Sequence, residues 1–205
     1  MTTIPLFPLN TVLFPDGHLP LQVFEVRYLD MVKKCIADER PFGVVALMQG
    51  SEVRQPAQME TLADCGTFAQ IVQWAEPMPG LLHINTIGTG RFRVGASERL
   101  KTGLWMADVE PVPADTVRDV PPPQQNVANG LGALIRSLQQ RGVKAEQMPL
   151  LQPYRLDEAG WVANRWCELL SLSTEQKLLL LMQQSPVLRL ELVQDVLSEN
   201  GLLEE

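Results

Sequence analysis

Residues 4–21 read Ile4-Pro-Leu-Phe-Pro-Leu-Asn-Thr-Val-Leu-Phe-Pro-Asp-Gly-His-Leu-Pro-Leu21, a run in which four prolines interrupt closely spaced apolar side chains. Proline cannot donate to a β-ladder, so within a sheet it is confined to edge strands, strand ends and bulges. The run therefore predicts short extended segments of an edge strand, broken at Asn10-Thr11 and again at the turn Pro15-Asp16-Gly17. Thr11–Phe14 between these breaks predicts a short strand. We expect the rest of the chain to pack against this segment.

The residues after this run change to helical spacing. From Phe24 onward, apolar side chains recur every three or four residues, which predicts an amphipathic helix that ends near Ala37, before Pro41. The next segment, Phe42–Met48, is apolar throughout and predicts a strand in the middle of a sheet. Residues 49–63 are polar and irregular, and predict a loop that serves either as a lid or as a slack connection.

Short β-rich segments with Gly and Pro turns continue to Val112. With the single early helix they predict an α+β fold that begins with a small, partly open barrel or a sandwich. Residues 111–123 are rich in proline and predict a semi-rigid linker. The pattern beyond is helical, with a capping box at Ser173–Gln176. We therefore divide the chain into a barrel, a linker and a helical bundle, at residues 1–117, 118–125 and 126–205.

Composition narrows the class of protein. The 205 residues carry a net charge of −7, which works against non-specific binding to nucleic acid or anionic lipid. The three cysteines lack CxxC spacing and predict buried free thiols in a reducing compartment. The first residues do not form a signal peptide. The longest apolar run, Leu178–Met182, is too short to cross a bilayer and predicts a buried helix. These features predict a soluble, cytoplasmic protein without membrane contact.

Several segments resemble one known family. Pro5-Leu-Phe-Pro-Leu9 and Gly88-Thr-Gly-Arg-Phe-Arg-Val94 are similar to segments of the N-terminal substrate-recognition domain of Lon proteases and of stand-alone bacterial proteins built from that domain. Further matches are Phe42–Leu47, Gly66–Ile71 and, less specifically, Leu169–Leu181. The resemblance implies a PUA-like pseudo-barrel, mostly antiparallel with one helix, followed by a C-terminal helical bundle. It also implies a role in holding unfolded polypeptide segments or a protein partner.

The resemblance does not extend to the ATPase and peptidase modules of full-length family members. The phosphate-binding pattern Gly-x-x-x-x-Gly-Lys-Ser/Thr is absent, and none of the five lysines lies near a glycine-flanked serine that could form a Ser–Lys dyad. We therefore expect a non-enzymatic binding module without a cofactor. A hydrolase with an unrecognised site, and RNA binding through the PUA-like barrel, are the alternatives left open, as is the oligomeric state.

The candidate peptide-binding residues are apolar side chains near the ends of predicted strands. If they are exposed, they form an apolar groove in which an extended peptide pairs with a sheet edge. If they are buried, they form a hydrophobic core between barrel and bundle. These residues are Phe14, Trp74, Met78, Leu81 and Trp105.

A pair of arginines adds a charged element to this hypothesis. Arg91 and Arg93 lie two apart on a predicted strand, so both side chains leave the same face. Such a pair can bind carboxylates, which would give charge selectivity for peptides, or phosphates, which would suit RNA. It can equally be a solvated outer face. The acidic net charge and the lack of a basic tract argue against a nucleic-acid partner.

Other polar residues carry weaker signals. His18 and His83 are the only histidines, too few for a zinc site without cysteine ligands at the right spacing, so we expect no metal. Glu25, Arg27 and Tyr28 fall within one helical turn. Because no nucleophile accompanies them, we interpret them as a charge pair that supports the start of the helix.

Overall fold

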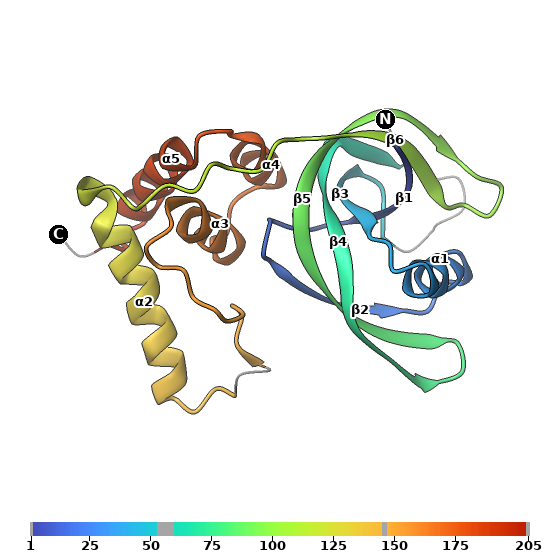
Figure 1. Cartoon of the computed structure of the whole chain (residues 1–205), viewed down its shortest axis with the longest axis horizontal. Coiled ribbons are helices and arrows are strands. Elements are labelled where there is room, and N and C mark those ends of the chain that lie inside the picture. The colour runs from blue at the N-terminus through green and yellow to red at the C-terminus, as the bar shows by residue number, and fades with distance from the viewer. Residues whose placement is uncertain (1, 53–59, 145–146, 204–205) are drawn as a thin grey trace. The chain divides into compact units, whose positions relative to one another are not determined.

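The computed structural model describes residues 2–52, 60–144 and 147–203 (Figure 1). The chain forms two compact units, Met1–Ala114 and Asp115–Glu205. The elements described in the first unit are β1 (Thr2–Leu9), β2 (His18–Val23), α1 (Val26–Ala37), β3 (Phe42–Gln49), β4 (Thr61–Met78), β5 (Leu81–Arg99) and β6 (Trp105–Pro111). Those described in the second are η1 (Pro122–Gln124), α2 (Gln125–Gln140), α3 (Ala159–Leu169), α4 (Thr174–Met182) and α5 (Pro186–Glu199). The protein is thus a mixed α+β protein.

The six described strands form one sheet in the order β2-β5-β4-β3-β1-β6, and β5 also pairs with β6. The sheet therefore closes on itself through five strands, while β2 extends it along β5. Strands β1 and β3 run parallel, and the other pairs are antiparallel. As predicted, a helix follows the opening run, and β3 lies inside the sheet between β1 and β4. Of the predicted loop 49–63, residues 53–59 lie outside the described residues.

Two predictions for the opening run are wrong. The proline-containing β1 is an interior strand, because β6 pairs with it up to Leu6 and β3 pairs with it from Leu6 onward. Pro5 therefore has a neighbour only in β6, and Pro8 only in β3, so neither missing N–H has to face two strands. Thr11–Phe14 forms no strand. Its backbone is held instead by the Thr67 hydroxyl, which donates to the Leu13 carbonyl at 2.6 Å.

Two core clusters of the first unit, built from described residues, lie on opposite faces of the closed sheet. One cluster packs β1, β2, β3 and β5 against α1, and includes Phe7 stacked on Tyr28 with ring centroids 4.1 Å apart. The other includes Ile4, Leu6 and Phe92. Alternate residues of β1 thus serve opposite faces, as strand geometry requires.

The second unit begins earlier than the composition suggested. Residues 118–125, predicted to be a linker, are bonded to this unit, because the amide of Val120 donates to the Asp157 carbonyl at 2.8 Å and Asp119 forms a β-bridge with Glu158. The expectation that the helix of Leu178–Met182 is buried on all sides is wrong, because Leu179 is 75% exposed. No described helix is both long and apolar enough to cross a membrane.

Candidate functional site

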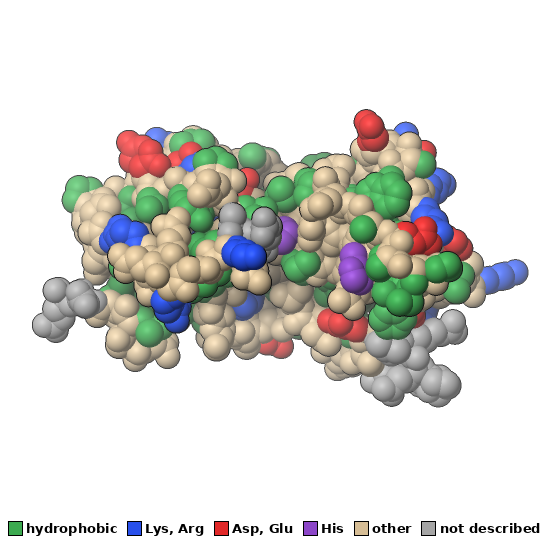
Figure 2. All heavy atoms as spheres, turned by 90° about the horizontal axis from the view of Figure 1, so that it is seen from below, with side chains coloured by type: hydrophobic (Ala, Val, Ile, Leu, Met, Phe, Trp, Pro, Cys, Tyr) green, Lys and Arg blue, Asp and Glu red, His purple; other side chains and the backbone are tan. Residues whose placement is uncertain are grey.

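The long β4–β5 hairpin carries three of the predicted binding residues. Trp74 lies opposite Ile84, and Met78 lies opposite Leu81 at the turn. Trp74 is 52% exposed and Met78 is 58% exposed, while Leu81 is partly buried. Figure 2, which views the molecule from the side toward which the hairpin projects in Figure 1, shows hydrophobic side chains gathered at that end of the unit. The structure therefore places Trp74, Met78 and Leu81 on one hairpin, with Trp74 and Met78 accessible.

An open hollow of about 510 Å³ lies beside Trp74, between β4 and the last turns of α1. Ile84 is part of the core beneath α1, so Trp74, which lies opposite it, faces the same side of the sheet. Lys33 on α1 forms an ion pair with Glu76 on the hairpin at 3.8 Å. We call this the α1 C-terminal hollow, and its lining residues are Cys35, Ile36, Glu39, Gln70, Ile71, Val72 and Trp74.

Phe14 and Trp105 do not belong to this surface. Phe14 is completely buried, so the expectation that it would be exposed beside Trp74 needs correction. Its backbone is pinned by the Gly17 amide, which donates to the Phe14 carbonyl at 2.9 Å. Trp105 is partly buried, and its indole N–H donates to the Glu60 carboxylate at 2.7 Å. Its ring packs against the second core cluster, so both aromatic residues support the barrel.

The arginine pair is split by its surroundings. Arg91 is only 4% exposed, and its guanidinium donates to the Pro113 carbonyl at 3.1 Å. Arg93 is exposed and lies opposite Glu110 on β6. The two residues share a strand parity, as predicted, but the segment around Pro113 covers only the first. A strand with two accessible guanidinium groups is therefore not formed.

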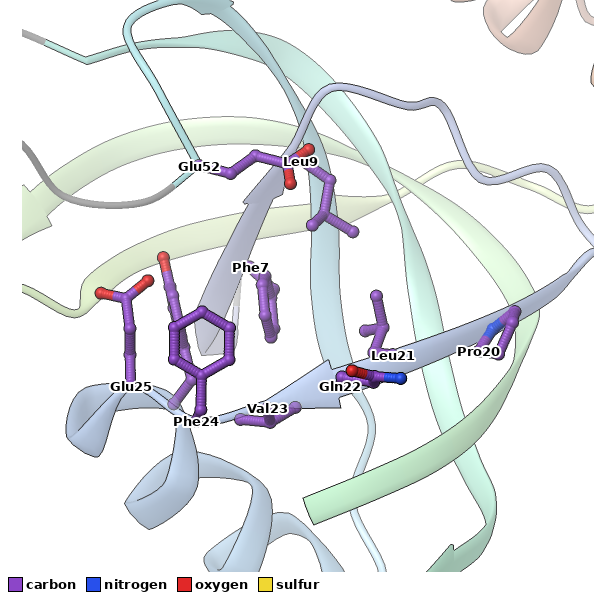
Figure 3. Close-up of a pocket in the computed structure, with 10 residues that line it drawn as sticks. Phe7, Leu9, Pro20, Leu21, Gln22, Val23, Phe24, Glu25 and Glu52 are labelled. Atoms are coloured by element: carbon purple, nitrogen blue, oxygen red, sulfur yellow. The ribbon is translucent and has the colours of Figure 1, made fainter. Parts of the chain in front are cut away.

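A second pocket, of about 220 Å³, lies at the other end of α1, beside β2 (Figure 3). The two pockets lie toward opposite ends of α1, and their nearest lining residues on that helix, Tyr28 and Cys35, are seven positions apart, about 10 Å along the helix axis. We call it the β2 pocket. Figure 3 shows Phe24 and Glu25 on one side, Leu21 and Gln22 along β2, and Glu52 beside Leu9. Its lining residues are Phe7, Leu9, Pro20, Leu21, Gln22, Val23, Phe24, Glu25, Tyr28 and Glu52.

The wall of the β2 pocket is fixed by stacked side chains. Arg27, which is 7% exposed, lies over the Tyr28 ring with its guanidinium carbon 4.4 Å from the centroid, and Tyr28 in turn stacks on Phe7. Arg27 also donates to the Gly103 carbonyl at 2.8 Å and to the Glu25 carboxylate at 3.1 Å. Burial raises the pKa of Tyr28 above its ordinary value, so its phenol stays neutral. Glu25, Arg27 and Tyr28 therefore support the structure.

Sequence reasoning did not find the β2 pocket. Its floor comes from strand residues that have the same apolar pattern as any core strand. The available signal was Phe24-Glu25-Val26 at the start of α1, where Phe24 is 57% exposed and Val26 is 72% exposed. Two exposed apolar residues two positions apart at a helix start are the kind of feature that marks an interaction surface.

A family model for the ATP-dependent protease La (LON) substrate-binding domain matches residues 3–199. The chain belongs to this family. It is 32% identical over 119 residues to Lon protease 2 from Sorangium cellulosum, and 29% identical over 120 residues to the protein cereblon from Danio rerio. These matches cover 58% and 57% of this chain but only 15% and 27% of the two relatives. The chain thus spans less than a third of the length of either relative.

Two solved structures of Lon N-terminal domains have a similar fold. A Lon N-terminal domain protein from Xanthomonas campestris is 31% identical, with a TM-score of 0.73 over 95% of this chain and 98% of that one. The N-terminal domain of the Mycobacterium avium complex Lon protease is 18% identical, with a TM-score of 0.62 over 97% and 99% of the two chains, and supports the fold alone. The fold of this chain is therefore that of a Lon N-terminal domain.

The three thiols of this Lon-family chain are poor nucleophiles. Cys35, Cys65 and Cys167 are free and buried. Burial raises the pKa of Cys65 to about 11 and that of Cys167 to about 12, and it raises the pKa of Cys35 as well. Within residues 2–52, 60–144 and 147–203, no three His, Cys, Asp or Glu side chains come together as a metal site would require.

The raised thiol pKa values predict a loss of stability in alkali. An unfolded thiol ionises near its ordinary pKa of about 9, whereas folded Cys167 keeps its proton until about pH 12. Between these values the unfolded state binds fewer protons, so the free energy of unfolding falls as pH rises, by up to about 1.4 kcal/mol per pH unit for this group. Denaturant titrations at several pH values should show a shallower slope in Cys167→Ala. Below pH 8 the free energies of unfolding of the two proteins should change with pH in the same way. If they still do so up to pH 11, the argument is contradicted.

Proposed function

We propose that this chain is a non-enzymatic binding module for unfolded polypeptide segments or for a protein partner. The observation that carries the proposal is the exposed apolar surface of the β4–β5 hairpin, where Val72, Trp74 and Met78 are each more than half exposed beside the α1 C-terminal hollow. Exposed side chains of this kind mark interaction sites. An extended segment would lay apolar side chains against Trp74 and into the hollow.

The direct contacts that we propose are Trp74, Met78 and Leu81. Arg93 lies nine residues along β5 from Ile84, the partner of Trp74, which is about 30 Å of extended strand. It can therefore act only on a long bound segment, as a source of charge selectivity at a distance. Phe14, Arg91 and Trp105 hold the barrel in shape and act indirectly.

The two alternative functions have less support. A thiol hydrolase would need an ionised cysteine, and the raised pKa values work against one. Binding of RNA through the barrel would use accessible basic side chains, and Arg91 is buried. We therefore propose a polypeptide or protein partner and no nucleic acid. A cytoplasmic location, with no membrane contact, is part of the same proposal.

The finer description of the fold is also a proposal. The closure of β5 onto both β4 and β6 supports a PUA-like pseudo-barrel for the first unit. The second unit holds α2, α3, α4 and α5, with the indole N–H of Trp166 on α3 donating to the Val127 carbonyl on α2 at 3.0 Å. This interhelical packing supports a C-terminal helical bundle.

Truncating the hairpin surface should weaken polypeptide capture. The probe is a small protein that has been reduced, carboxymethylated and labelled with fluorescein, so that it stays unfolded. In fluorescence anisotropy, Trp74→Ala combined with Met78→Ala should lower its affinity at least tenfold, because loss of a buried aromatic anchor costs about 2 kcal/mol or more. Leu179→Ala is the matched control, since Leu179 is 75% exposed in the second unit. Unchanged affinity in the hairpin variant would contradict the proposed surface.

A further inference from the structure

We propose that the β2 pocket is a second polypeptide site, which binds an extended segment carrying one large apolar side chain next to a lysine or arginine. The segment would pair with the free edge of β2 and place its apolar side chain in the pocket. This inference rests on the proposed function, because it assigns a class of peptide to a polypeptide-binding chain. It depends on the free edge of β2 and on the size and charge of the β2 pocket, all of which are independent of the hairpin surface.

The free edge of β2 follows from its hydrogen bonds to β5. Gly17 accepts from the Gly88 amide at 2.9 Å, and Leu19 accepts from the Thr86 hydroxyl at 2.9 Å, so the backbone groups of the odd-numbered residues face β5. In an antiparallel pair, the residues between them face the opposite way. The N–H and C=O of Gln22 and the C=O of Pro20 therefore point away from β5.

Nothing in the described part of the chain pairs with this outer side of β2, for which β5 is the single strand partner. Pro20 fits there because its missing N–H faces away from the ladder. Gln22 retains an outward donor and an outward acceptor. An extended peptide can use this pair to add a strand to the sheet, which is a common way in which domains bind peptides.

The size of the pocket favours a single side chain. Its volume of about 220 Å³ is below the roughly 300–1,000 Å³ of typical small-molecule sites. Leu9, Leu21 and Val23 line it with aliphatic groups, and the stacked rings of Phe7 and Tyr28 close it. Phe24 stands at its side (Figure 3). Such a pocket suits leucine, methionine or phenylalanine from a bound strand.

The charge of the pocket selects the neighbouring residue. Among its described lining residues are two carboxylates, those of Glu25 and Glu52, and no lysine, arginine or histidine. One oxygen of Glu25 accepts from Arg27, whose remaining contacts are to Gly103 and Tyr28, and one oxygen of Glu52 accepts from the Asn10 amide. Within the part of the chain that the structure describes, the second oxygen of each carboxylate has no hydrogen-bond partner, so it can bind a cation. A lysine or arginine beside the apolar residue satisfies this arrangement, and a phosphate group does not.

The test compares labelled ten-residue peptides by fluorescence anisotropy at low salt. All three peptides consist of serine and threonine except at the centre. The first has a central leucine flanked by lysine, and the second has a central leucine flanked by glutamate. The third has a central alanine flanked by lysine. The intact protein should bind the first peptide about tenfold tighter than either other peptide, which is the effect of one charge-assisted hydrogen bond or one buried apolar side chain. The combined change Glu25→Gln and Glu52→Gln should abolish the preference for lysine over glutamate.

A matched pair of variants tests the strand addition. Gln22→Pro removes the outward N–H, as Pro20 already does two residues earlier, and should weaken the lysine peptide at least tenfold, whereas Gln22→Ala keeps the N–H and should bind normally. Equal binding by these two variants, or equal affinity for the lysine and glutamate peptides, would overturn the inference. A dimer in sedimentation that only Gln22→Pro dissociates would overturn it too, because a second copy would then occupy the edge.

A separate titration distinguishes failure of this inference from failure of the proposed function. The unfolded, carboxymethylated protein is titrated into the same Gln22 and Glu variants. If it still binds in a Trp74-dependent way while the peptides show no preference, only the inference about the β2 pocket fails. If neither the unfolded protein nor any peptide binds to the folded chain, the proposed function fails with it.

Discussion

Replacing Arg189 with methionine is expected to lower the free energy of unfolding of the second unit by about 3 kcal/mol. Arg189 is 1% exposed on α5, and its five N–H groups are all used. Two of them bind both oxygens of Asp115, at 2.6 and 3.3 Å, and a third binds the Asn164 side chain at 2.9 Å. The others bind the carbonyls of Leu180 and Gln183.

The size of the effect follows from what the substitution leaves behind. Methionine keeps much of the apolar stem but removes the charge, so the Asp115 carboxylate and two carbonyls lose a buried donor. Breaking a buried ion pair from one side costs about 3–5 kcal/mol. We expect the lower end of this range because the Asp115 side chain is 20% exposed and can be partly hydrated. The loss of stability in Arg189→Lys should be smaller than in Arg189→Met, since lysine keeps the charge but cannot form the bidentate bond to the carboxylate.

Hydrogen exchange measured by mass spectrometry checks this prediction in the intact chain. Amides of α3, α4 and α5 should lose protection in Arg189→Met, because the guanidinium ties these helices to Asp115, while strands β3 and β4 of the first unit should exchange as before. Arg141→Met is the matched control, because Arg141 is exposed at the end of α2. Equal protection in the two variants would show that the Arg189 network adds little stability.

Local patterns were sufficient for the elements whose structure depends on neighbouring residues. The capping box at the start of α4 forms as predicted: the Ser173 hydroxyl accepts from the Gln176 amide at 3.2 Å, and the Gln176 side chain accepts from the Ser173 amide at 2.9 Å. The amphipathic α1 also forms as predicted, and the start of α5 depends on neighbouring residues in the same way, because the Ser185 hydroxyl accepts from the Leu188 amide at 3.3 Å. In each case the partners lie within one or two helical turns.

Features that depend on distant partners were not visible in the sequence. Arg189 looks like a surface residue of an amphipathic helix, because its partner Asp115 lies 74 positions away. Arg91 was expected to be as accessible as Arg93, and only the packing of the segment around Pro113 distinguishes them. The same holds for β1, whose prolines suggested an edge strand until the stagger of its two neighbours was known.

The candidate site was predictable in part for the same reason. Trp74 and Met78 lie on β4 just before the turn at Pro79-Gly80, so local sequence placed them near the end of a hairpin but left open whether they were exposed. Phe14 has the same apolar character, but its burial depends on how residues 10–17 fold onto β4 and β5. The β2 pocket forms where β1, β2 and the start of α1 come together. The hydrophobic periodicity of a single segment cannot predict such a tertiary arrangement.

Replacing Gly88 with alanine is expected to destabilise the first unit by about 3 kcal/mol, the upper end of the usual cost of overpacking a core. A Cβ atom at this position would lie 2.2 Å from the Phe14 carbonyl oxygen. That oxygen belongs to the backbone, and the strands cannot separate easily, because the Gly88 amide donates to Gly17 at 2.9 Å and the Gly88 carbonyl accepts from Asp16 at 2.7 Å. The opening run and β5 would have to move apart.

Gly90, two residues further along the same motif, provides the control. A Cβ atom there would meet its nearest neighbour, a ring carbon of Phe68, at 3.7 Å, which is ordinary contact. Gly90→Ala should therefore change the free energy of unfolding by less than about 1 kcal/mol. In thermal unfolding, 3 kcal/mol corresponds to a fall of roughly 6–12 °C for a chain of this size. Similar melting temperatures for the two variants would mean that the opening run is not held against β5 as closely as the structure shows, and the β2 pocket, which that run helps to form, would then lose its defined shape.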